Sequence, residues 1–208
     1  VEEEGAVLLK NDNNALPLKT SASDKKKISL FSISSVDPAY GGRGSAQSGS
    51  ASDQVTPVQG FEQSGFEVNA DLHNFYKSNQ SKYARSGRGV NALINDAPWT
   101  DITAAVSESK IAEYGDAAVF ILTRVGGEGA DAAYTGTDGE DGNYLKLSAN
   151  EKSVLQGLAQ MKQSGRVKRI ILLLNVANQV ECKSFLSDGL GVDAVLWIGS
   201  VGITGFNA

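Results

Sequence analysis

The sequence contains very little cysteine and histidine. Cys182 is the only cysteine and His73 the only histidine among 208 residues. No internal disulfide can form, so a small scaffold held together by disulfides is excluded. Zinc sites built from several His and Cys ligands are excluded as well. Only His73 could serve a Ser-His-Asp triad, and the chain has no Gly-x-Ser-x-Gly motif, so we interpret His73 as an ordinary surface or half-buried residue.

Excess positive charge and long apolar runs are also missing. The net charge is −5 and the pI about 5.0, which argues against a protein that binds nucleic acid through the phosphate backbone. No apolar run approaches the ~18 residues of a membrane span, and the acidic N-terminus lacks a signal-peptide pattern. Hydrophobic residues make up 41% and charged residues 21%, as in soluble globular proteins. Without an internal repeat or linker, residues 1–208 predict one domain, which we expect to be a piece of a longer polypeptide.

Short apolar runs alternate with segments of helical period. The run at 117–122 is almost wholly apolar, as is typical of strands covered on both faces of a parallel sheet. Ser148 and Glu151 form a capping box before a helical stretch that Gly165 ends. The predicted strands are 28–34, 66–69, 117–122, 167–174 and 192–198, and the other predicted helices are 55–64, 103–114 and 180–186. This order predicts an α/β fold, a doubly wound and mostly parallel sheet flanked by helices in a flavodoxin-like sandwich.

Two long loops interrupt this order, at 36–53 and 124–145. Each directly follows a predicted strand, so both are expected at the carboxyl edge of the sheet, where ligands of such folds bind. The first contains Gly41-Gly42-Arg43-Gly44-Ser45, which matches neither a P-loop nor Gly-x-Gly-x-x-Gly. Either it is a flexible loop, or its backbone approaches a ligand closely and Ser45 donates a hydrogen bond.

The second loop holds six glycines and five acids, among them Glu128 between Gly127 and Gly129. Most loop carboxylates are solvated surface groups, but the position after a central strand favours a functional one. The acids at 138–143 do not fall at the positions of an EF-hand, so no metal is predicted. The segment 76–99 is polar, basic and aromatic in places, and we interpret it as a surface insertion.

Six strings in order along the chain resemble the second, C-terminal-type α/β sandwich domain of family 3 glycoside hydrolases. Glu128 lies in the string Gly127-Glu128-Gly129-Ala130-Asp131, which resembles the Gly-Glu-Gly-x-Asp string that holds the acid/base of many family β-glucosidases. Ala132 replaces an Arg that is frequent after this string, and Asn143 and Phe206 are further departures. The other five similar strings are 4–18, 41–45, 142–148, 174–181 and 202–208.

The resemblance implies a retaining exo-β-glycosidase of the β-glucosidase type, which hydrolyses terminal β-linked glucose without a cofactor. It implies Glu128 as acid/base and Ser45, Arg43 and Asp131 as substrate-binding residues, although Asp131 could equally cap a local turn. The nucleophile, an Asp on a (β/α)8 barrel of about 250 residues, would come from another domain of the same enzyme, so we expect the isolated chain to be inactive. A homo-oligomer is possible. The alternatives are a β-xylosidase of the same family, or a non-catalytic module that binds carbohydrate or a nucleotide.

Overall fold

A central sheet organises the molecule. The computed structural model describes residues 2–42, 51–87, 91–129, 131–186 and 189–207. Its six described strands follow the order β1-β6-β5-β4-β2-β3, with β1 antiparallel to β6 and all other pairs parallel. The strands are β1 (Val7–Asn11), β2 (Lys27–Phe31), β3 (Glu67–Val68), β4 (Ala117–Arg124), β5 (Ile170–Val176) and β6 (Ala194–Trp197).

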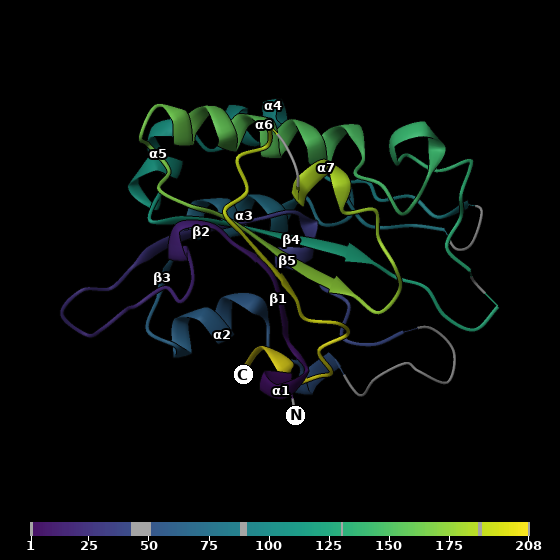
Figure 1. The fold of residues 1–208 in the computed structure, drawn as a ribbon, viewed down its shortest axis with the longest axis horizontal. Helices are drawn as coiled ribbons and strands as arrows, with labels where there is room; N and C mark the ends of the chain where they lie inside the picture. The colour runs from purple at the N-terminus through teal and green to yellow at the C-terminus, as the bar shows by residue number, and fades with distance from the viewer. Residues whose placement is uncertain (1, 43–50, 88–90, 130, 187–188, 208) are drawn as a thin grey trace.

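Helices lie on both faces of the sheet, which confirms the predicted α/β sandwich. Figure 1 shows α3 to α7 on one side and α2 with the two chain ends on the other. The α-helices are α1 (Glu2–Gly5), α2 (Pro57–Gln63), α3 (Ala70–Ser78), α4 (Trp99–Ala105), α5 (Glu108–Glu113), α6 (Ala149–Gln163) and α7 (Lys183–Leu186). Short 3-10 turns are η1 (Asp12–Asn14), η2 (Ile33–Ser35), η4 (Ala51–Asp53), η6 (Glu140–Gly142) and η7 (Gly205–Asn207).

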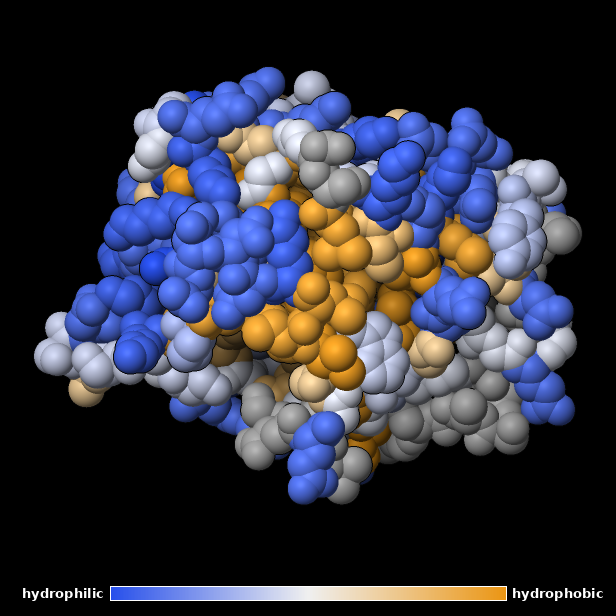
Figure 2. All heavy atoms as spheres, viewed as in Figure 1, coloured by the Kyte–Doolittle hydropathy of each residue, from blue (hydrophilic) through white to orange (hydrophobic). Residues whose placement is uncertain are grey.

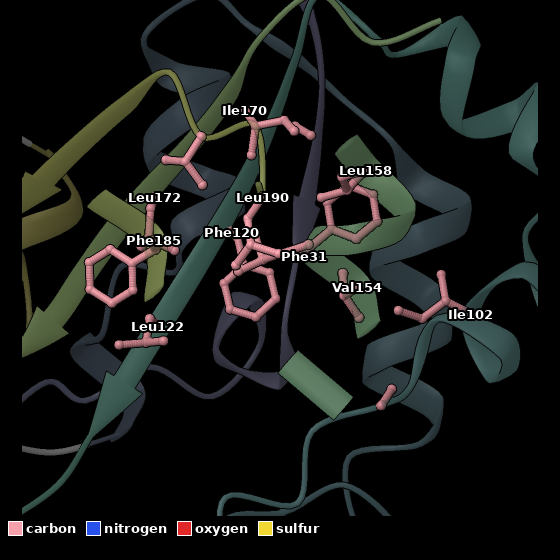
Figure 3. Close-up of a cluster of buried hydrophobic side chains, with 14 of the residues drawn as sticks. Phe31, Ile102, Phe120, Leu122, Val154, Leu158, Ile170, Leu172, Phe185 and Leu190 are labelled. Carbon is pink, nitrogen blue, oxygen red and sulfur yellow. The ribbon is translucent and has the colours of Figure 1, made fainter. Parts of the chain in front are cut away.

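The larger apolar core lies between the sheet and the helices α3 to α7. Side chains from β2, β4 and β5 meet those of α4 and α6 there, and Figure 3 shows Phe31, Phe120 and Leu158 close together. Every residue of β4 and β5 is buried, as expected of central parallel strands. The two strands pair from Ala118 with Ile170 to Arg124 with Val176, so they end at the same level and bring their following loops side by side.

The opposite face of the sheet is covered less completely. Its core includes Leu30, Val119 and Leu173. A hollow of about 640 Å³ remains between strands β1, β4, β5 and β6, helix α2 and the C-terminal turn. On β1, Val7, Leu8 and Leu9 are each about half exposed, at 46–49%. Figure 2 shows an apolar area at the centre of this view, where β1 runs in Figure 1. In the described part of the chain, no helix is long and apolar enough to cross a membrane.

Several element boundaries differ from the sequence prediction. The predicted strand 28–34 ends at Phe31, because Ser32 has φ 84° and starts the 3-10 turn η2. The predicted helix 103–114 is divided into α4 and α5, since Val106 is extended and Ser107 caps a new helix. Strand β1 and helix α3 were not predicted. The capping box of α6 is confirmed, with both the Ser148 and the Glu151 side chains hydrogen-bonded as expected.

Candidate functional site

A hollow of about 550 Å³ opens at the carboxyl edge of the sheet. Segments that follow β2, β4, β5 and β6 form its wall, so four stretches far apart in sequence meet at one place. This is where ligands bind in open parallel sheets. The residues that line it are Tyr40, Gly41, Gly42, Gly126, Gly127, Asp131, Ala132, Ala177, Asn178, Ser200 and Gly202.

Asn175, near the end of β5, holds three of these segments together. Its Oδ1 accepts hydrogen bonds from the Ala39 amide at 2.6 Å and from the Thr123 hydroxyl at 3.0 Å. Its Nδ2 donates to the carbonyl oxygens of Ala39 at 2.9 Å and Gly199 at 2.7 Å. The side chain is fully buried, so these bonds form away from water, where they are most effective. Sequence reasoning missed this role, although an Asn within an apolar strand was a usable signal.

Glu128 lies in the loop that leads from β4 towards α6. Glu128 and Asp131 are both exposed, and Asp131 lines the hollow. Gly129 has φ 62°, in the left-handed region where glycine is favoured, so the glycine beside Glu128 allows the chain to turn there. The predicted placement of this loop at the carboxyl edge of the sheet is therefore confirmed.

The base of this loop is fixed by Arg124, the last residue of β4. The guanidinium uses all five N–H donors: it donates to the carbonyl oxygens of Thr123, Tyr144 and Lys146 and to both carboxylate oxygens of Glu151. Both members of the pair are buried and 2.8 Å apart. Burial disfavours the charged guanidinium, but Glu151 outweighs that effect and raises the pKa of Arg124. The bidentate pair gives both ends of the loop a defined geometry.

Two predicted site residues, Arg43 and Ser45, lie outside the described residues. The described start of their segment, Tyr40 to Gly42, does line the hollow. The Gly202 amide donates to the Tyr40 carbonyl at 2.8 Å, and this bond fixes Tyr40 against the loop after β6. Among the residues that the structure describes, no group of three or more His, Cys, Asp or Glu is placed to hold a metal ion.

These features define the class of the molecule: a doubly wound α/β sandwich domain with a loop-lined hollow at the carboxyl edge of its sheet. The family follows from a sequence match, because residues 6–208 fit the Glycosyl hydrolase family 3 C-terminal domain. The chain therefore belongs to glycoside hydrolase family 3, as its C-terminal domain.

Known relatives agree with this assignment. Beta-glucosidase A from Butyrivibrio fibrisolvens is 26% identical over 97% of this chain, which spans 25% of that protein. A beta-glucosidase structure from Paenibacillus barengoltzii has a TM-score of 0.77 at 23% identity, with 99% of this chain and 21% of that one covered. Beta-glucosidase 3B from Thermotoga neapolitana, solved with alpha-D-glucose, gives 0.73 at 25% identity, with 99% and 27% covered. The chain thus spans about a quarter of the length of its relatives.

Proposed function

We propose that this domain supplies Glu128 as the acid/base of a retaining β-glucosidase that acts on terminal β-linked glucose. The observation that supports the proposal best is the position of Glu128. It is an exposed carboxylate on the loop after the central strand β4, next to a hollow lined by four converging segments. Membership of family 3 and the likeness to proteins named β-glucosidases support the proposed substrate class.

The chemistry needs a second carboxylate. A retaining glycosidase places two carboxyl groups about 5–5.5 Å apart, one to attack the anomeric carbon and one to protonate the leaving oxygen and then activate water. The proposed partner is an Asp on a (β/α)8 barrel of the same enzyme. Because such a barrel needs about 250 residues, it would lie in the part of the enzyme beyond this domain. The exposure of Glu128 is consistent with a site that forms between two domains.

The proposal includes three further contacts to the sugar. Asp131 lines the hollow, and it would bind a sugar hydroxyl or orient the loop three residues after Glu128. Arg43 and Ser45 would contact the sugar from the loop after β2. Each side chain offers hydrogen bonds of the kind that a sugar hydroxyl accepts or donates.

The test is Glu128→Gln in the full-length enzyme, with aryl β-glucosides of graded leaving-group ability. The value of kcat/KM reports the step in which the glycosidic bond breaks, and an acid matters most there when the leaving group is poor. We expect a loss of about 10²- to 10⁴-fold for poor leaving groups and a far smaller loss for activated ones. The isolated domain should show no turnover of either.

Glu140→Gln is the matched control. Glu140 is an exposed Glu of the same loop that pairs with Lys152 at 2.8 Å, so this variant should behave as the wild type. An equal loss for all leaving groups in Glu128→Gln would contradict an acid role. Turnover by the isolated domain would contradict the two-domain site.

A further inference from the structure

Part of the segment 76–99, which the sequence suggested to be a surface insertion, packs against the loop that holds Glu128. The described residues of this part, which we call the 84–97 segment, are 84–87 and 91–97. Ala92 and Ile94 are buried, with exposed fractions of 5% and 2%. They form a small apolar cluster with Ala133 and Tyr144 from the Glu128 loop. These side chains are therefore not in water, as a surface insertion would leave them, and this part of the segment packs against the Glu128 loop.

A carboxylate joins the two segments. Asp138 of the Glu128 loop accepts a hydrogen bond from the Ile94 amide at 2.7 Å and another from the Asn95 amide at 2.9 Å. Each oxygen takes one bond, and hydrogen bonds to an ionised acceptor are about twice as strong as neutral ones. Asp138 is thus a second point at which the Glu128 loop is held, in addition to the Arg124–Glu151 pair.

The partner side of this contact has a defined shape. Asn95 has φ 50°, and its side chain donates to the Ala84 carbonyl at 2.9 Å and to the Ser86 hydroxyl at 3.0 Å. Ser86 and Leu93 form an antiparallel bridge with bonds of 3.2 and 2.8 Å. These bonds fix the direction of the two amides that Asp138 accepts from.

The 84–97 segment is in turn anchored to the rest of the domain. The buried Asp96 accepts from the Ile33 amide at 3.0 Å, directly after β2. Arg85 donates to the Ser34 hydroxyl at 2.9 Å and pairs with Asp37 at 3.0 Å. The segment therefore connects the loop after β2 with the loop after β4, and both line the hollow.

The contact reaches Glu128 through a short stretch of backbone. Ala133 packs in the shared cluster, and its carbonyl accepts from the Tyr144 amide at 3.0 Å. The Tyr144 hydroxyl accepts from the Val125 amide, also at 3.0 Å. Val125 and Ala133 are thus both fixed against Tyr144, and Glu128 lies between them in the sequence.

We infer that Asp138 is a positioning residue: by holding the Glu128 loop to the 84–97 segment, it sets the place of the acid/base carboxylate. This inference depends on the proposed function of Glu128. A misplacement of about 1 Å in a catalytic group can cost about 10²-fold in rate, so a support that does not touch the substrate can still control the reaction.

The experiment uses the full-length enzyme with the same graded aryl β-glucosides. Asp138→Ala should lower kcat/KM for poor leaving groups by about tenfold or more and for activated ones much less, the pattern of Glu128→Gln in weaker form. Asp138→Asn keeps the side-chain shape and one acceptor oxygen, but its nitrogen would face a backbone N–H that it cannot accept from, so a loss of the same pattern is expected. Asp141→Asn is the control, because the Asp141 side chain is 75% exposed in the same loop and forms a local ion pair with Lys146.

A double variant separates positioning from general damage. If Asp138 acts through Glu128, then Asp138→Ala should cost almost nothing further in a Glu128→Gln background. An undiminished loss in that background, or an equal loss for all leaving groups, would overturn the inference. If Asp138→Ala does not fold, Asp138→Asn takes its place in the same comparison. Failure of the Glu128→Gln pattern itself would instead disprove the proposed function.

Discussion

Asp96 should make the stability of this domain depend on pH in a way that one substitution removes. The carboxyl group is fully buried, and its Oδ1 accepts hydrogen bonds from the Ile33 and Ala97 amides. Among the described residues its Oδ2 has no partner. Burial, followed by the nearby charge of Glu151, raises the pKa of Asp96 from 3.8 to about 6, and the hydrogen bonds offset only part of this.

The sign follows from the two protonation states. Below about pH 4, Asp96 is protonated in both the folded and the unfolded chain, so its titration takes nothing from the free energy of unfolding. Between about pH 4 and pH 6, the unfolded chain has lost this proton and the folded chain keeps it, so stability falls as the pH rises. Above about pH 6 both states are ionised and the loss is complete. At about 1.36 kcal/mol per pH unit, the loss amounts to about 3 kcal/mol.

Asp96→Asn is the perturbation, since the amide keeps an oxygen that can accept from Ile33 and Ala97 but cannot ionise. The assay is urea unfolding of wild type and variant between about pH 4 and pH 7.5, followed by fluorescence of Trp99 and Trp197. Other titrating groups cancel in the difference between the two proteins. We expect the variant to gain about 3 kcal/mol relative to the wild type across this range. Parallel stability curves would refute the reasoning.

Two further predictions concern packing. Asn175→Ala should lower the free energy of unfolding in the same urea assay by about 3 kcal/mol or more, because buried partners such as the Ala39 amide lose their hydrogen bond. The control Asn178→Ala, in the next loop, should lower it far less. Gly157→Ala should lower the thermal midpoint of unfolding, because the added Cβ would lie 2.3 Å from the Trp99 ring. Such overpacking costs about 1–3 kcal/mol, which outweighs the gain in helix propensity of up to about 1 kcal/mol from alanine. A higher midpoint in calorimetry would contradict the close packing.

The features that the sequence predicted correctly are those with a local signal. The apolar runs of β4 and β5 identify buried parallel strands, and the Ser148 capping box identifies the start of α6. Strand β1 has no such signal, because its apolar residues Val7 to Leu9 are consecutive and half exposed at the sheet edge. Helix α3 did carry one, an Asn69 cap before Leu72 and Tyr76 at helical spacing, which was overlooked.

The position of the Glu128 loop was predictable from the sequence, but the contacts that hold the loop in place were not. Glycines after a central strand located the Glu128 loop. In contrast, the sequence predicts that Arg124 starts an irregular loop, whereas the structure buries it at the end of β4, where it forms five hydrogen bonds. The contact of Asp138 with residues 94 and 95 joins positions more than 40 apart in sequence, with separations of 44 and 43. Such pairs leave no local pattern, because tertiary packing alone brings them together.

Buried polar groups gather where the loops of the site begin. Arg124 ends β4, Asn175 lies near the end of β5, and Asp96 holds the backbone directly after β2. Apolar residues would often stabilise such positions at least as well, since burying charge is costly. We infer that these buried polar groups fix the positions of the loops that begin there. If Glu128 completes a site with another domain, as proposed above, an ordered loop favours the association, because ordering a loop during association weakens the interaction. Buried hydrogen bonds thus gather beneath the Glu128 loop, while Glu128 itself is exposed.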